Sequence, residues 1–87
     1  RRTARMAKVT LPIEVARSHC HGERDHDVSG SDIREIVKTL ELQFPGLRER
    51  LNQGLAVAID GEIFQEWLLQ EVETNSEVYF LPAIEGG

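Results

Sequence analysis

Two glycines, Gly86 and Gly87, follow an apolar, strand-like run over residues 78–85. Glycine has no Cβ atom, so it packs nothing in a folded element and leaves its backbone free. The same property lets an enzyme close around the main chain and reach the last carbonyl group. The carboxylate of Gly87 is therefore the first candidate for chemistry, as a group delivered into another protein's active site.

The residues before the glycines would position this carboxylate. An extended chain spans about 3.3 Å per residue, so residues 82–87 reach roughly 20 Å, which is enough to cross a shell of protein. Pro82 biases Leu81 towards an extended conformation and so directs the exit from the last strand. Ile84 is a candidate anchor for an apolar slot. We assign Gly87 as the reacting residue, and the partner-binding residues are Leu81, Pro82, Ile84, Glu85 and Gly86.

A second candidate cluster contains the only cysteine of the chain, in the run His19-Cys20-His21, with His26 nearby. Neighbouring side chains of an extended segment point to opposite faces, so His19 and Cys20 cannot easily share one ion. The spacing of His21 and His26 fits only half of a four-ligand zinc pattern. A solvated loop that binds no metal is the preferred interpretation. Nothing marks a depressed pKa at Cys20, so we expect a lone loop thiol and not a nucleophile.

Composition limits the classes of function. A chain of 87 residues has room for one small domain. Hydrophobic residues at 40% and charged residues at 29% are typical of soluble globular proteins. A net charge of −5 argues against nucleic acid as a partner and favours a basic protein surface. No apolar run approaches the ~20 residues of a membrane-spanning helix. With a single cysteine and no secretory leader, we expect a cytoplasmic protein.

The first half of the chain predicts a strand, a loop and a helix. Residues 8–15 alternate between apolar and polar, which is typical of a half-buried strand, although Pro12 would require a bulge or a kink. A polar loop over 17–27 leads into a weak strand near 25–28. The long helix then begins at a capping pair, Asp32 with Glu35, and ends at Pro45-Gly46. The apolar face of this helix contains Ile33, Ile36, Val37, Leu40 and Phe44.

The second half predicts a short helix over 47–51 and then three strands. Residues 55–59 are apolar on both faces, as in a strand covered on both sides. The pair Asp60-Gly61 makes a tight turn into a short strand, and residues 78–81 form the last one. Phe80 is expected in the core and Tyr79 on the outer face. Trp67 with Phe64 indicates core or rim packing and not a cofactor site. The fold class is α+β, with one main helix on a mixed sheet.

This order of elements, together with three sequence motifs, resembles a known family. The motifs are Ala58-Ile59-Asp60-Gly61-Glu62, Leu81-Pro82-Ala83 and the terminal Gly86-Gly87. They are similar to those of the ubiquitin-like sulfur carriers of the MoaD/ThiS family, most of all the small subunit of molybdopterin synthase. The resemblance implies a β-grasp fold of about four to five strands, with the first and last strands parallel at the centre. It divides the chain into a disordered extension or cloning remnant (1–7), the domain (8–83) and a flexible diglycine tail (84–87).

The resemblance also implies a chemistry. An E1-like adenylating enzyme would use ATP to activate the carboxylate of Gly87, which is then converted to a thiocarboxylate. The sulfur would pass to a metabolite on a larger synthase subunit or another sulfur-accepting enzyme, in molybdopterin (molybdenum cofactor) biosynthesis. This chain would bind no cofactor and would not be catalytic alone.

Three features depart from the family pattern. Pro12 falls in the expected central strand, the turn before the last strand is Thr74-Asn75-Ser76, and Glu85 precedes the glycines. Other acceptors stay open: thiamine, cysteine or another sulfur metabolite. A ubiquitin-like modifier conjugated to lysines through Gly87, or a plain interaction domain, would have the same fold.

Overall fold

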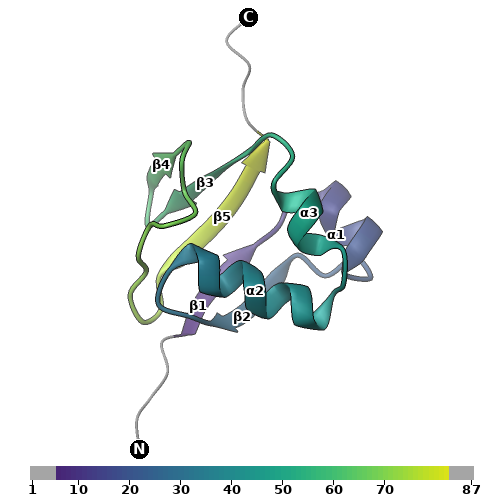
Figure 1. Ribbon diagram of the computed structural model, residues 1–87, viewed down its shortest axis with the longest axis horizontal. Helices are drawn as coiled ribbons and strands as arrows, with labels where there is room; N and C mark the ends of the chain where they lie inside the picture. Colours follow the sequence, from purple (N-terminus) through teal and green to yellow (C-terminus); the bar gives the residue numbers. More distant parts are fainter. Residues whose placement is uncertain (1–5, 83–87) are drawn as a thin grey trace, which may run out of the picture.

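The computed structural model describes residues 6–82, and residues 1–5 and 83–87 lie outside the described part. The described residues form five strands and three helices (Figure 1). In chain order these are β1 (Met6–Thr10), α1 (Ile13–His19), β2 (Asp25–Ser29), α2 (Ile33–Gln43), α3 (Leu47–Leu51), β3 (Leu55–Ile59), β4 (Glu62–Phe64) and β5 (Glu77–Pro82). β1 includes Met6 and Ala7, so these two residues belong to the domain and not to the expected extension over 1–7, whose residues 1–5 lie outside the described part. None of the described helices is long and apolar enough to cross a membrane.

The five strands form one mixed sheet in the order β2-β1-β5-β3-β4. β1 and β5 lie side by side and parallel, with Val9 opposite Val78. The remaining pairs, β1–β2, β3–β5 and β3–β4, are antiparallel. α2 lies across β1 and β2, and α3 packs beside it (Figure 1). This arrangement confirms the predicted α+β class and the β-grasp order with its parallel central pair.

The core lies between the sheet and the helices. Phe80 is 2% exposed and its ring meets the Trp67 ring edge-on, with centroids 5.5 Å apart. Tyr79 points to the outer face and is 42% exposed, because successive strand residues alternate between faces. The indole N–H of Trp67 donates to the Leu55 carbonyl at 2.9 Å. The predictions of an inward Phe80, an outward Tyr79 and a packed Trp67 are confirmed.

The predicted capping pair at the start of α2, Asp32 with Glu35, is confirmed, and Ser31 takes part in it as well. The Asp32 carboxylate accepts from the Glu35 amide at 2.9 Å. The Glu35 carboxylate accepts in return from the amide and the hydroxyl of Ser31, at 2.8 and 3.0 Å. These contacts satisfy donors that the first turn of a helix leaves unpaired.

The predicted first strand over 8–15 is wrong in its second half. β1 ends at Thr10, and Pro12 is the N-cap of α1, with its carbonyl accepting from the Ala16 amide at 2.9 Å. β1 has a neighbour on both sides, and proline cannot donate to a strand ladder, so the strand must stop before Pro12. Val15 is buried as predicted, but on a helix, and Ile13 is 51% exposed.

Candidate functional site

The candidate site is built on β5, which carries the chain towards its carboxyl end. β5 pairs with β1 over residues 77–79 and with β3 over residues 78–82, so its first half is held on both edges and its last residues are held by β3. Tyr79 lies opposite Thr10 of β1 and Ala58 of β3. A strand that is paired on both edges at its start and with β3 up to its end gives the segment that follows it a defined origin and direction.

Asp60 fixes the start of β5. Its carboxylate accepts from the Glu77 amide and from the Ser76 hydroxyl, both at 2.9 Å. Ser76 is 2% exposed, and its hydroxyl accepts in turn from the Glu73 amide at 2.8 Å. Asp60 adopts a left-handed φ of 50°, which aspartate tolerates better than most residues. One side chain in the β3–β4 turn therefore anchors the turn that leads into β5.

Two of the six predicted site residues belong to the described part of the chain. Leu81 is half-buried and lies opposite Ala56, and Pro82 is exposed opposite Leu55. The other four, Ile84, Glu85, Gly86 and Gly87, lie outside the described residues, and their roles stay predictions. The described part of the site is thus the origin of the tail and the surface around it.

An apolar stripe crosses the open face of the sheet, on the side away from the helices. It consists of Ile63 on β4, Ala58 on β3, and Tyr79 and Leu81 on β5. Ala58 lies opposite both Ile63 and Tyr79, so the three strands present these side chains in one row. Ile63 is 61% exposed and Tyr79 is 42% exposed. Large apolar side chains that gather on an exposed face are typical of a protein interaction site.

Acidic residues flank this stripe on β2 and β5. Glu77 and Asp27 lie opposite Lys8 from its two sides, and Asp25 lies opposite Thr10. The Thr10 hydroxyl donates to the Asp25 carboxylate at 2.9 Å. These residues line a shallow depression of about 230 Å³ that ends at Tyr79. The open face therefore combines apolar contact with a negative border, which suits a basic partner surface.

A hollow of about 530 Å³ lies at the end of β5, where the last strand meets the start of α1 and the end of α3. Leu81 and Pro82 line it together with the exposed Ile13 and the guanidinium side chains of Arg24 and Arg50. The Arg24 Nε donates to the Leu11 carbonyl at 3.0 Å, which holds this side chain at the rim. Glu14 lines the hollow as well, so the hollow offers apolar contact, two guanidinium groups and one carboxylate at the origin of the tail.

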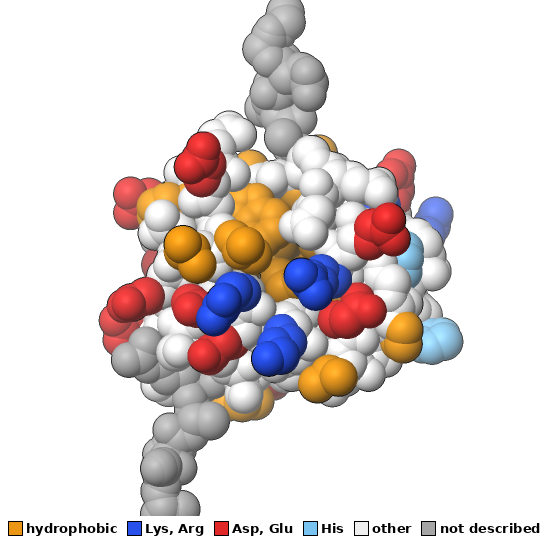
Figure 2. Space-filling view, in the orientation of Figure 1, with side chains coloured by type: hydrophobic (Ala, Val, Ile, Leu, Met, Phe, Trp, Pro, Cys, Tyr) orange, Lys and Arg blue, Asp and Glu red, His pale blue; other side chains and the backbone are white. Residues whose placement is uncertain are grey.

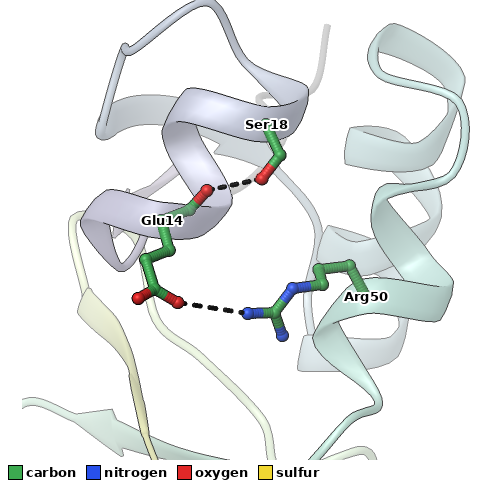
Figure 3. A network of polar contacts seen from close by, with 3 residues as sticks. All are labelled: Glu14, Ser18 and Arg50. Carbon is green, nitrogen blue, oxygen red and sulfur yellow. Dashed lines mark hydrogen bonds and ion pairs between the residues drawn. The ribbon is translucent and has the colours of Figure 1, made fainter.

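Arg50 is oriented across this hollow by a contact between helices. Its guanidinium lies 3.8 Å from the Glu14 carboxylate of α1, and Ser18 donates to the Glu14 carbonyl at 2.6 Å (Figure 3). The sequence interpretation missed this group, because it placed residues 13–15 in a strand. The signal was present: a proline followed two residues later by an acidic side chain is typical of a helix start.

The histidine–cysteine cluster is dispersed, which corrects the expected solvated loop. Cys20 is the C-cap of α1 and is fully buried, and burial first and Glu23 second raise the pKa of its thiol. His21 is exposed with a left-handed φ of 55°. The His26 ring instead packs edge-on against Phe44, at 5.4 Å between centroids. No group of three or more histidine, cysteine or acidic side chains within residues 6–82 is placed to hold a metal ion.

Comparison with solved structures places this geometry among known folds. One chain of the crystal structure of the BexX/CysO complex from Amycolatopsis orientalis is 27% identical, with a TM-score of 0.78 over 93% of this chain and 99% of that chain. CysO from Mycobacterium tuberculosis is 22% identical, with a TM-score of 0.79 over 90% of this chain and 99% of that one. Small archaeal modifier protein 1 from Methanosarcina acetivorans is 19% identical, with a TM-score of 0.75 over 99% of this chain and 100% of that chain.

The last two likenesses show the fold alone, because their identities are below 25%. No curated protein sequence matches the chain directly. The model of the ThiS family, however, matches residues 13–87. This match includes α1, the Asp60 turn, β5 and the diglycine end, and it covers far more than half of the sequence. The chain therefore belongs to the ThiS family of ubiquitin-like sulfur carriers.

Proposed function

We propose that this protein is a sulfur carrier whose reacting group is the carboxylate of Gly87. One observation carries the proposal most directly: β5, which stays paired with β3 up to its last residue, ends at Pro82 beside the exposed apolar stripe. A partner enzyme would bind the stripe and accept residues 83–87 into its active site. From Pro82 to Gly87 the chain can span roughly 20 Å when extended, so the carboxylate can enter a deep active site.

The activation step makes a poor electrophile reactive. A carboxylate oxygen of Gly87 attacks the α-phosphorus of ATP on an E1-like adenylating enzyme, pyrophosphate leaves, and an acyl-adenylate forms. A sulfur nucleophile then attacks the carbonyl carbon and AMP leaves, so that one oxygen of the carboxylate is replaced by sulfur. The partner must supply the positive groups that stabilise the phosphoryl charge. The task of this chain is to hold the carboxylate in place, which accounts for several kcal/mol in well-oriented reactions.

The Arg24 and Arg50 side chains add a further element to this proposal. They lie at the hollow where Leu81 and Pro82 leave the sheet, and Glu85 is three residues beyond Pro82. Arg50 lies 3.8 Å from the Glu14 carboxylate, whereas Arg24 forms no ion pair among residues 6–82. The Arg24 charge therefore offsets negative charge in the tail or on the partner during docking. The likeness to a chain of the BexX/CysO complex supports docking of this kind, since that structure contains two different proteins in one complex.

Two acceptor pathways for the sulfur are supported by different observations. The Leu81-Pro82-Ala83 approach to the tail resembles the molybdopterin branch and supports transfer to a molybdopterin precursor. The likeness to CysO, with one matched chain 27% identical, supports a cysteine-forming acceptor instead. The acceptor is selected by the pocket of the second partner enzyme, so this chain would act in the same way in either pathway.

Intact mass spectrometry tests the proposal. The protein is incubated with ATP, a sulfide source and the activating enzyme from the same organism. A mass gain equal to exchange of one oxygen for one sulfur supports the sulfur carrier. Higher-mass conjugates through lysine amides would instead show a ubiquitin-like modifier. An unchanged mass, with the enzyme active on another carrier, would contradict both and leave an interaction domain.

A further inference from the structure

A second surface lies on the helical side of the molecule, away from the apolar stripe. Two depressions of about 590 and 400 Å³ adjoin there and share Asn52 and Leu68 in their lining. They are formed by α2, α3 and the connecting segment over residues 65–70. Figure 2 shows an apolar hollow on this face with basic side chains gathered along one rim. We call this surface the helical-face hollow.

Two leucines at this hollow are held in exposed positions. Leu68 is 44% exposed and Leu69 is 73% exposed. Before them the Trp67 indole N–H is bonded to the Leu55 carbonyl at 2.9 Å. After them the Gln70 carbonyl accepts from the Ile33 amide at 2.9 Å. The segment is therefore fixed at both ends, and the leucines are presented by an ordered backbone, which lowers the ordering cost of binding.

Three basic side chains define the rim. Arg34 and Lys38 are four residues apart and share one face of α2, and Arg48 projects from α3. All three are exposed, and none takes part in an ion pair; the ion pair found among residues 6–82 joins Arg50 to Glu14. This concentration of positive charge stands out in a chain with a net charge of −5.

The acidic side chains nearest the rim are occupied by helix capping. The Glu35 carboxylate accepts from the amide and the hydroxyl of Ser31. The Glu41 carboxylate accepts from the Gly46 amide at 3.1 Å and from the Arg48 amide at 2.9 Å. A further acid, Glu66, lines only the depression that lacks the three cations. Both carboxylates keep their charge and offset part of the rim charge, since Glu35 interacts with Arg34 and Lys38 and Glu41 interacts with Arg48. The lining of the depression, with three cations and the Glu35 carboxylate, stays net positive towards a binding partner.

We propose that the helical-face hollow binds an acidic segment of a partner protein that carries apolar side chains. Leucine contacts in the hollow would supply the apolar part, and carboxylates would meet the rim cations. Three cations are fewer than the four to eight of a typical lipid-binding cluster. The negative net charge also opposes a nucleic-acid polyanion. Gly87 takes no part in this binding, so a negative result for the helical-face hollow would leave the sulfur-transfer proposal untouched, and the reverse.

A titration followed by amide NMR tests this proposal with a synthetic probe. The probe is a hexapeptide, Asp-Glu-Leu-Leu-Asp-Glu, added to the ¹⁵N-labelled full chain. We expect chemical-shift changes on α2, α3 and residues 65–70, and weaker binding at higher salt. Matched peptides replace the leucines by serine, or the acids by lysine, and both should bind at least about fivefold more weakly, because each lacks one half of the contact.

Substitutions in the protein give the second test. Arg34→Glu should weaken peptide binding about fivefold, whereas Arg17→Glu on α1 makes the same charge change on another surface and should leave it unchanged. Leu69→Ser should likewise weaken binding, with Ile63→Ser on the open face of the sheet as its control. A thermal melt confirms that each variant is folded.

Four outcomes would overturn the proposal. The first is shift changes confined to the open face of the sheet. The second is equal binding of the serine peptide, which would reduce the contact to unspecific charge attraction. The third is tighter binding of a thymidine oligonucleotide than of the acidic peptide. The fourth is self-association of the chain that Arg34→Glu abolishes, which would assign the hollow to a second copy.

Discussion

At the scale of residues, Asp60 is exposed but connects two parts of the sheet. Its carboxylate joins the β3–β4 turn to the start of β5 through Ser76 and Glu77. The Asp60 amide also donates to the Glu77 carbonyl at 2.9 Å. The strand that leads to the diglycine end is therefore set in place by one side chain almost a full strand length from the tail.

Replacing Asp60 by alanine should lower the free energy of unfolding by about 2 kcal/mol, because the buried Ser76 hydroxyl and the Glu77 amide lose a charged acceptor. Asp60→Asn keeps one acceptor oxygen and a residue that tolerates a left-handed φ, so its loss should be smaller. Urea unfolding measures both. A loss below about 0.5 kcal/mol for the alanine variant would show that the contact is incidental.

Cys20 is a packing residue by the same local argument. The thiol is fully buried, and its pKa is raised by burial first and by Glu23 second, so it stays protonated at neutral pH. An aromatic disulfide reagent should modify the native chain at least about tenfold more slowly than the urea-unfolded chain, because it cannot reach the sulfur. Equal rates would contradict the burial and restore Cys20 as a candidate nucleophile.

At the scale of elements, two glutamates hold the helices by capping contacts, and this makes stability depend on pH. The amide of Arg48 first, and that of Gly46 second, lower the pKa of the Glu41 carboxyl. A folded pKa below the unfolded value of about 4.3 means that the ionised form stabilises the fold. Its contribution is present above that unfolded value and is lost as pH falls through the folded pKa.

The urea midpoint of the natural chain should therefore fall more steeply from about pH 5 to pH 3 than that of Glu41→Gln. Glu49→Gln on α3 is the control, because the Glu49 carboxylate makes no hydrogen bond among the described residues. If the urea midpoints of the natural chain and Glu41→Gln fall in parallel with pH, the Glu41 capping contacts do not stabilise the fold.

Most elements could be predicted because their signals are local. Neighbouring residues are enough to predict the Asp32 cap, the apolar face of α2 and the Asp60-Gly61 turn. α1 has a local start signal in Pro12 and Glu14, but the alternation of Val9, Leu11, Ile13 and Val15 fits a strand period and competes with it. The deciding fact was tertiary: β1 is paired on both edges, so the chain must leave the sheet before Pro12.

The site could be predicted in part for a related reason. The diglycine end and its approach through Leu81 and Pro82 are readable from the sequence, because they are contiguous. The apolar stripe and the hollow with Arg24 and Arg50 join side chains from separate strands and helices. Only the pairing of β3 with β4 and β5 brings Ile63 and Tyr79 into one row on either side of Ala58, and no local pattern contains that pairing.

At the scale of the whole molecule, the two sides of the sheet have different chemistry. The open face presents the apolar stripe with an acidic border, and the helical side presents leucines with a basic rim. A carrier that must meet more than one partner benefits from separate surfaces, because one partner need not leave before the next approaches. The stripe includes Leu81, which directly precedes the last residue of β5, so we propose that it contacts the activating enzyme.

Ile63→Asp should lower kcat/KM for carrier activation about tenfold, because a charge replaces an apolar contact in the stripe, while the melting temperature stays nearly unchanged. The control is Leu42→Asp on α2, where the side chain is 79% exposed outside the stripe. A pyrophosphate-release assay with the activating enzyme measures both. Equal rates for the two variants would place the docking surface elsewhere.

The most direct measurement of the central claim locates the sulfur after a single round of activation with ATP and sulfide. Fragment mass spectrometry should find oxygen exchanged for sulfur at Gly87 in the natural chain. A variant with one alanine appended after Gly87 should show no exchange and an unchanged fold. Sulfur added at Cys20, or full exchange in the extended variant, would contradict the account.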